Sequence, residues 1–262
     1  MKRLMLTLML LWLIPVLLAQ PILAPIGRNI GVGSYSRHFQ HLLSAWYTPA
    51  GLSCLSAAAL GVYAERRFML QEMPLYGVVG TVPVPGGAFG AGIFRFGNTA
   101  WHQQQVGGAY GRRLGAKAGV GLKFSYTSVT VQGAGNSGSF SVQGGLLWHF
   151  SEKLHMGVNF LKPLQEGTVY SLGVGWEASG QCLLTGELMR MPAFTQVKAA
   201  AFYRLGQALA LEMGVTSAPV YNNAGIVFYL HSLRIDVAAA FHPQLGLTPS
   251  TVLIWQLPTS AK

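Results

Sequence analysis

The sequence predicts an all-β fold, a transmembrane antiparallel up-and-down β-barrel of about fourteen strands with an N-terminal plug or hatch segment. Its 262 residues are 51% hydrophobic and only 10% charged, whereas soluble domains carry about 25% charged residues. After residue 20, glycines and polar residues interrupt every apolar stretch before it reaches the roughly 20 residues that a spanning helix needs. Because lipid requires all backbone polar groups to be paired internally, a hydrophobic chain without spanning helices fits a closed barrel.

The first 19 residues are typical of a secretory signal peptide. Lys2 and Arg3 precede an apolar run that ends at Leu18, and Ala19 places a small residue at the expected cleavage point. A single transmembrane anchor is the alternative, but the run is short and contains Pro15 near its end. We therefore expect residues 1–19 to be cleaved and the mature chain to reside in the cell outer membrane.

The rest of the chain divides into two parts. Residues 20–53 do not alternate between apolar and polar side chains, and they end at the turn-forming residues Pro49, Ala50, Gly51 and Leu52. We expect this part to be a plug or hatch folded into or against the barrel mouth. Residues 54–262 read as segments of roughly ten residues with period-two alternation, which is the barrel pattern. A barrel of this size, lined by small residues, either stays wet or needs a plug.

Fourteen strands are expected within residues 54–262. They lie near residues 54–64, 68–84, 87–98, 99–111, 114–131, 139–151, 153–162, 168–178, 181–190, 194–204, 207–216, 220–231, 233–242 and 248–257. An even number is typical of single-chain bacterial barrels. Twelve strands are the alternative, because Pro74, Pro83 and Pro85 make poor strand sequence.

The register of each strand predicts which charges face the lumen. A lipid-facing Lys or Arg near the bilayer midplane costs about 2 to 4 kcal/mol, so strand charges should point inward. When the bulky apolar residues set the register, nine charged residues fall on the inner face: Lys117, Lys123, Glu177, Glu187, Lys198, Arg204, Glu212, Arg234 and Asp236. Arg190 is an exception at a strand end, from which it can reach lipid headgroups. The near balance of sign favours lumen-filling ion pairs over a selective filter.

Catalytic, cofactor and metal sites are not expected. Residues 133–138 match GxGxxG, but no helix follows, so we expect a flexible loop tip rather than a nucleotide site. His38 and His41 lack a third ligand for a metal. Ser151 with His149 and His155 could suggest a lipid hydrolase, but by the register both histidines point inward, away from lipid, and the spacing places no acidic partner.

Charge and cysteine content bound the partners. The formal net charge of +10 is spread thinly, which indicates contact with outer-membrane lipid and lipopolysaccharide headgroups and no nucleic-acid binding. Cys54 and Cys182 lie far apart in the sequence, and their spacing does not establish a disulfide. The preferred interpretation is that each is a small apolar residue of the barrel wall.

Four glycine-rich patches resemble a known family. They are residues 48–52 (TPAGL), 86–97 (GGAFGAGIFRFG), 109–115 (AYGRRLG) and 242–249 (HPQLGLTP). These patches are similar to outer-membrane barrels of the fatty-acid-transporter type, especially the Bacteroidota barrels that resemble PorV and PorQ of the type IX secretion system. In that family the first patch closes the N-terminal hatch, so the resemblance implies the same role for Pro49, Ala50, Gly51 and Leu52.

The resemblance implies two functions. The first is a non-enzymatic integral outer-membrane barrel that serves as an accessory subunit of a type IX secretion-like protein-export translocon, in contact with a larger outer-membrane complex. The short loops and the plugged lumen favour this role. The alternative is a small transporter that passes hydrophobic solutes through the barrel lumen past the hatch. An apolar cavity in the lumen would distinguish the alternative.

Overall fold

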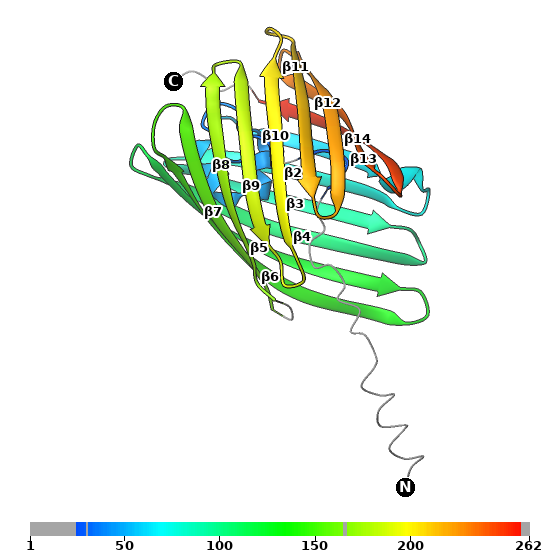
Figure 1. Ribbon diagram of the computed structural model, residues 1–262. Coiled ribbons are helices and arrows are strands. Elements are labelled where there is room, and N and C mark those ends of the chain that lie inside the picture. Colours follow the sequence, from blue (N-terminus) through cyan, green and yellow to red (C-terminus); the bar gives the residue numbers. More distant parts are fainter. Residues whose placement is uncertain (1–24, 30, 165–166, 258–262) are drawn as a thin grey trace.

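Fourteen strands form one closed antiparallel barrel in the computed structural model, which describes residues 25–29, 31–164 and 167–257. Each strand pairs with its two neighbours in sequence, and β1 pairs with β14 to close the barrel. Figure 1 shows the strands as a tilted cylinder coloured in sequence order. The predicted all-β barrel with fourteen strands is confirmed, and the alternative of twelve strands is wrong.

The strand bounds follow the predicted order closely. They are β1 Ala59–Arg66, β2 Pro74–Val84, β3 Gly87–Gly97, β4 Trp101–Leu114, β5 Ala118–Val131, β6 Gly135–His149, β7 Leu154–Pro163, β8 Val169–Ser179, β9 Cys182–Arg190, β10 Thr195–Arg204, β11 Leu209–Ser217, β12 Val220–Leu230, β13 Leu233–His242 and β14 Gly246–Gln256. The short helical elements are α2 Leu42–Tyr47, η1 Pro49–Cys54 and η2 Arg67–Met69.

Several boundaries differ from the prediction by a few residues, and three of them have a clear reason. The first strand begins at Ala59 rather than at residue 54, because Pro49–Cys54 forms a 3-10 helix that extends the lumen segment. Strand β2 begins at Pro74 rather than at residue 68, because proline is better tolerated as the first residue of a strand than in its interior. The expected loop tip at residues 133–138 is mostly strand, because β6 begins at Gly135 and pairs with β5 from there.

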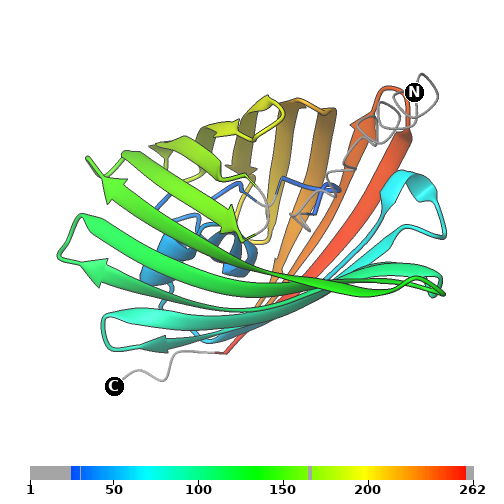
Figure 2. The same cartoon turned by 90° about the horizontal axis from the view of Figure 1, so that it is seen from below.

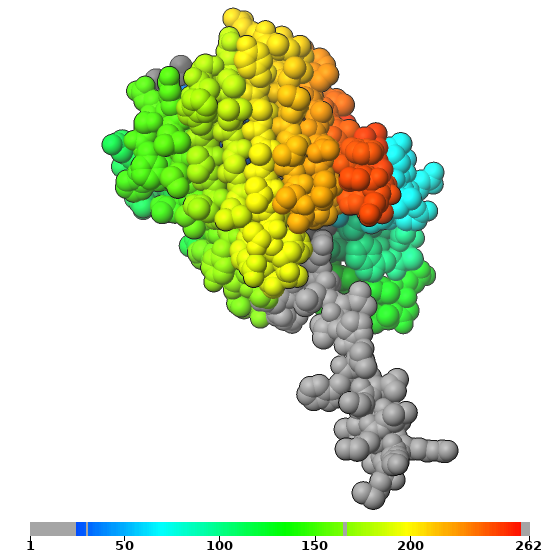
Figure 3. Space-filling model, in the orientation of Figure 1, coloured from blue at the N-terminus to red at the C-terminus, as the bar shows by residue number. Residues whose placement is uncertain are grey.

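The outer wall of the barrel is apolar. On β8, for example, Leu172 and Trp176 are exposed, whereas Ser171 and Glu177 on the opposite face are buried. In the space-filling view the strands pack into a continuous wall (Figure 3). A large exposed apolar surface of this kind matches the hydrocarbon region of a bilayer. In the part of the chain that the structure describes, no helix is long and apolar enough to cross a membrane.

Outward charges lie near strand ends. Beyond the predicted Arg190, the outer face of the strands carries Arg66, Arg95, Arg112 and Lys162, each within three residues of the end of its strand. Long basic side chains at these levels can reach the headgroups while their aliphatic stems stay in lipid. The cost that keeps charges off the midplane therefore does not apply to them.

The N-terminal segment lies inside the barrel. Its helical part, α2 and η1, is the blue element enclosed by the strands in Figure 2. His41 is the N-cap of α2, and its Nδ1 accepts the backbone N–H groups of Leu43 and Ser44 at 3.2 and 3.4 Å. Its apolar residues are buried against the inner faces of β1 to β4 and β14. We call the described residues 25–29 and 31–54 the hatch. The predicted signal peptide, residues 1–19, lies outside the described residues.

A charge on the lipid-facing wall should destabilise the barrel. Leu172 lies at the centre of β8 and faces outward, so we expect Leu172→Arg to lower the free energy of unfolding by about 2 to 4 kcal/mol. Urea titrations in phospholipid vesicles measure the change. As a control, Leu205→Arg places the same charge in the exposed β10–β11 turn and should change stability by less than about 1 kcal/mol. Equal losses in the two variants would contradict a bilayer around this wall.

Candidate functional site: a lumen cavity beside a bound hatch

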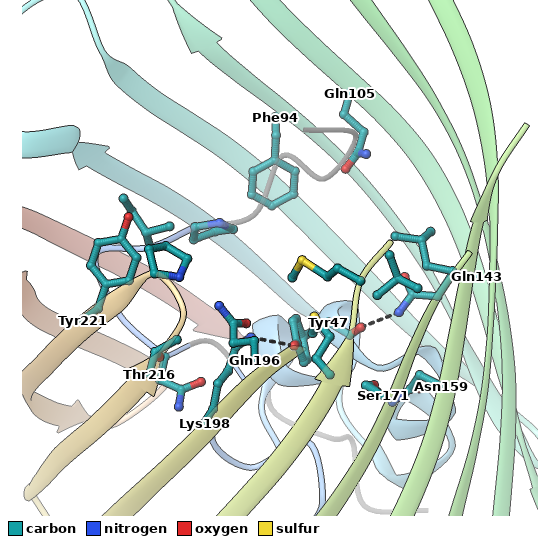
Figure 4. A pocket seen from close by; sticks show the side chains of 18 of the residues that line it. Tyr47, Phe94, Gln105, Gln143, Asn159, Ser171, Gln196, Lys198, Thr216 and Tyr221 are labelled. Carbon is teal, nitrogen blue, oxygen red and sulfur yellow. Dashed lines mark hydrogen bonds between the residues drawn. The ribbon is translucent and has the colours of Figure 1, made fainter. Parts of the chain in front are cut away.

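A cavity of about 550 Å³ lies in the lumen next to the hatch. Its walls come from Trp46 and Tyr47 of the hatch, Phe94 of β3, the β9–β10 connection at Met191–Phe194 and Tyr221 of β12. Figure 4 shows the side chains of Tyr47, Phe94 and Tyr221 around this cavity, each from a different part of the chain. The exposed surface of the cavity is mainly apolar. Its volume is within the range of pockets that enclose small organic ligands.

The polar groups at the floor of this cavity are occupied by the hatch. Lys123 Nζ donates to the carbonyl of Trp46 at 3.0 Å and lies 4.8 Å from the centre of the Trp46 ring. Gln143 Nε2 donates to the carbonyl of Tyr47 at 2.8 Å, and Lys198 Nζ donates to the Tyr47 hydroxyl at 2.9 Å. Because these donors are satisfied by the hatch, the side of the cavity formed by Trp46 and Tyr47 presents chiefly aromatic surface.

Acidic residues of the inner wall hold the hatch along its length. Five acidic residues among those that the structure describes point into the lumen: Glu65, Glu177, Glu187, Glu212 and Asp236. Each of the five accepts hydrogen bonds from hatch residues. Glu65 Oε2, for example, accepts the backbone N–H groups of Ile26 and Gly27 at 3.0 and 2.7 Å. Glu187 accepts the hydroxyl groups of Tyr35 and Tyr47 at 2.7 and 2.8 Å.

Arg28 is a buried anchor near the beginning of the hatch. Its guanidinium pairs with Glu212 and with Asp236, and its side chain is 1% exposed. Burial by itself lowers the pKa of Arg28, but the two carboxylates outweigh burial and raise the pKa above its ordinary value. Arg234 Nε donates to the other oxygen of Asp236 at 2.8 Å. A buried cluster of two basic and two acidic groups therefore fixes the beginning of the hatch.

Glu177 anchors the next part of the hatch. One of its oxygens accepts the Ser36 hydroxyl and the Arg37 N–H, both at 2.7 Å, and the other lies 2.6 Å from His38 Nδ1. His155 Nε2 lies 3.0 Å from the same carboxylate. His155 also lies 2.9 Å from His149 through their Nδ1 atoms. Both histidines point inward, as the register predicted. Glu177 is an acidic partner of His155 that the spacing in the sequence did not reveal.

Glycines let the hatch backbone approach the wall. A Cβ atom added at Gly121 of β5 would lie 2.2 Å from the carbonyl carbon of Pro49. A Cβ atom at Gly175 of β8 would lie 1.5 Å from the carbonyl oxygen of Tyr35. Real Cβ atoms do not approach other atoms so closely, so the hatch fits only because these inward positions lack side chains. The inner faces of β4 to β8 therefore carry small residues where the hatch backbone lies against them.

The residues predicted for the site fall into three groups. Pro49, Ala50, Gly51 and Leu52 are fully buried in η1 and pack on the inner faces of β4 and β5. Eight of the nine predicted lumen charges lie on the inner wall: Lys123, Glu177, Glu187, Lys198, Arg204, Glu212, Arg234 and Asp236. The prediction for Lys117 is wrong. It lies exposed in the turn between β4 and β5, because β5 begins only at Ala118.

The histidines and cysteines have structural contacts. His41 caps α2, and its pKa is held well below the ordinary value by burial and then by the nearby charges of Arg234 and Arg28. His38 pairs with Glu177. Cys54 and Cys182 are both free thiols. No group of three potential metal ligands is found among the described residues.

Sequence reasoning missed several anchors. Arg28, Tyr35 and Trp46 lie in the segment that lacks alternation, so no register assigned them a direction. Glu65 was also missed, although it follows Gly61 and Tyr63 at period-two spacing on the inner face of β1. That spacing could have identified it.

Comparison with solved structures finds similar barrels among hydrocarbon transporters. The toluene transporter TbuX of Ralstonia pickettii has a TM-score of 0.66 at 10% identity, covering 85% of this chain and 94% of that one. The toluene transporter TodX of Pseudomonas putida also has a TM-score of 0.66, at 9% identity, covering 89% and 99%. A Pseudomonas aeruginosa FadL homologue has a TM-score of 0.60 at 11% identity, covering 89% and 97%.

These likenesses establish a shared fold at very low identity. No protein-family model matches this chain, and no curated protein matches it. The resemblance to the fatty-acid-transporter type is thus supported at the level of the barrel. The narrower resemblance to secretion-system barrels of the Bacteroidota is not shown.

Side chains at the glycine contacts should displace the hatch. Gly121→Val introduces atoms where the Pro49 backbone lies, so the hatch must shift and Arg28, now 2% exposed, should become accessible to trypsin. Cleavage after Arg28 in the detergent-solubilised protein, followed by mass spectrometry, measures the shift. Gly186→Val is the matched control, because Gly186 is also in a strand but has nothing within 4 Å of its Cβ position. Protection of Arg28 in both variants would contradict this assignment.

Removing the Arg28 guanidinium should destabilise the folded barrel. In Arg28→Met, the carboxylates of Glu212 and Asp236 lose a buried partner, and breaking a buried ion pair in this way costs about 3 to 5 kcal/mol. Urea unfolding in phospholipid vesicles measures the loss. The exposed Arg190→Met should change stability by no more than about 0.5 kcal/mol. A loss for Arg28→Met as small as that of the control would show that the cluster does not hold the hatch.

Proposed function

We propose that this chain is a non-enzymatic outer-membrane channel for small hydrophobic solutes. The observation that carries the proposal is the mainly apolar cavity of about 550 Å³, which lies between the hatch and the inner wall of a closed barrel. Hydrophobic walls with a few fixed polar groups are typical of sites that bind small organic molecules. An apolar lumen cavity was the feature that would distinguish the transporter from the export subunit.

The similar structures support the same choice. TbuX and TodX are toluene transporters, and CymD, with a TM-score of 0.61 at 12% identity, is a monoaromatic hydrocarbon channel. The rings of Trp46, Tyr47 and Phe94 at the cavity suit planar aromatic or short aliphatic solutes, because ring stacking adds to the gain from burying apolar surface. These findings favour the transporter over an accessory role in protein export.

The hatch gives the proposed channel a closed state. Residues 42–54 fill the lumen below the cavity and pack against the inner wall. A solute that enters from the end with the β9–β10 and β11–β12 connections would reach the cavity first. It would pass onward only when the hatch shifts. The contacts of this wall with outer-membrane lipid and lipopolysaccharide remain predictions, as does any larger protein partner.

Filling the cavity should block solute uptake. Thr216 of β11 lines the cavity (Figure 4), whereas its neighbour Val215 faces outward with 53% of its surface exposed. We expect Thr216→Trp to reduce the uptake of radiolabelled toluene, by bacterial cells that produce the protein, to the rate of cells without it. Val215→Trp should leave uptake unchanged.

The two outcomes are distinguishable. If Thr216→Trp cells take up toluene as fast as cells with the unmodified protein, the cavity is not on the solute path. Equal impairment by Val215→Trp would indicate a folding defect. The mobility of unboiled protein in electrophoresis checks folding in each case.

A further inference from the structure

A second cavity, of about 240 Å³, lies at the opposite end of the lumen. Its walls are residues 38–41 of the hatch, Phe202 and Arg204 of β10, Tyr229 and residues 231–234 around the β12–β13 turn, and Gln256 of β14. It shares no lining residue with the larger cavity. In contrast to that cavity, its surface is mainly polar. The hatch therefore separates two lumen sites of different chemistry.

Three buried N–H groups at this cavity lack an acceptor. They are Nε2 of His41, Nε of Arg204 and Nη2 of Arg234, none of which has a hydrogen-bond partner among the described residues. His41 is 3% exposed and Arg234 is 7% exposed. Buried polar groups are nearly always paired, so three unpaired donors on residues that line one cavity point to an acceptor that binds there.

Hydrogen bonds hold His41 and Arg234 in place, and contacts with two aromatic rings hold Arg204. His41 Nδ1 accepts two backbone N–H groups at the start of α2, so the ring proton of the neutral form is on Nε2. Asp236 accepts a hydrogen bond from Nε of Arg234, and Nη2 of Arg234 has no partner among the described residues. Arg204 is held between the rings of Phe39 and Tyr229, at 5.2 and 5.4 Å from their centres. The site is therefore built before any ligand binds.

The charge of the cavity selects an anion. Two arginines line it, and no aspartate or glutamate among the described residues does. Asp236 already pairs with Arg234, so Arg204 is the lining arginine without a carboxylate partner in the described part of the chain. Guanidinium groups form strong charge-assisted hydrogen bonds with carboxylates and phosphates. We propose that this cavity binds a small oxyanion, a carboxylate or phosphate group, through His41, Arg204 and Arg234. This site is independent of hydrophobic-solute transport and adds a second ligand class to the lumen.

Isothermal titration calorimetry of the full-length barrel in detergent tests the proposal. Inorganic phosphate and butyrate are titrated separately, each against a background of chloride. We expect saturable binding of one anion per chain for at least one of the two. Binding of phosphate alone assigns the site to phosphate groups, and binding of butyrate alone assigns it to carboxylates. The absence of saturable binding for both, which is the result expected if water alone satisfies the donors, overturns the proposal.

Two variants locate the binding. Arg204→Gln removes the charge, and Arg204→Lys keeps the charge and the contact with the two rings but loses the Nε donor. We expect each to weaken anion binding by about tenfold or more, because bonds between charged groups are the strong ones. The control is Arg190→Gln, an exposed arginine at the other end of the barrel, which should bind as the unmodified protein does. Equal weakening in the control overturns the assignment. Should Arg204→Gln fail to fold, Arg204→Lys alone decides.

Discussion

The buried carboxylates of the inner wall are the constraint on which this structure depends. Five acidic side chains point into a lumen from which the hatch excludes most solvent, and a buried charge without a partner is very costly. The hatch supplies those partners through backbone N–H groups, hydroxyls and Arg28. Wall and hatch therefore need each other, and neither the acidic residues nor the hatch sequence can be interpreted alone.

The same pairing explains why a plugged barrel keeps an apolar cavity. The basic and amide groups at the cavity floor form hydrogen bonds with Trp46 and Tyr47 of the hatch. What remains toward the lumen is largely ring and aliphatic surface. On the other side of the hatch the balance is reversed, because Arg204 and His41 keep donors that the wall does not satisfy. One short segment thus creates two environments within a single barrel.

Much of the fold could be predicted from the sequence because lipid outside imposes period-two alternation on every strand. From that alternation, fourteen strands were located and the inward direction of eight of nine charged residues was predicted correctly. It failed where the rule does not operate: at Lys117, which is beyond a strand end, and at residues 135–138, where small polar residues conceal a strand. The anchors Arg28 and Tyr35 could not be predicted, since the hatch has no repeat that ties position to direction. Cavities arise from packing between segments that are distant in the sequence, so no local sequence pattern predicts them.

The place of α2 has a consequence for how the barrel assembles. Leu42 packs on the inner side of the seam between β1 and β14, where a Cβ at Gly61 would lie 2.5 Å from its side chain and Ile254 completes the contact. The last strand to be synthesised thus completes its pairing over a helix made near the beginning. Pairing of β1 with β14 therefore encloses α2 within the lumen. The contact of α2 with both strands of the seam links the packing of the hatch to the closure of the barrel.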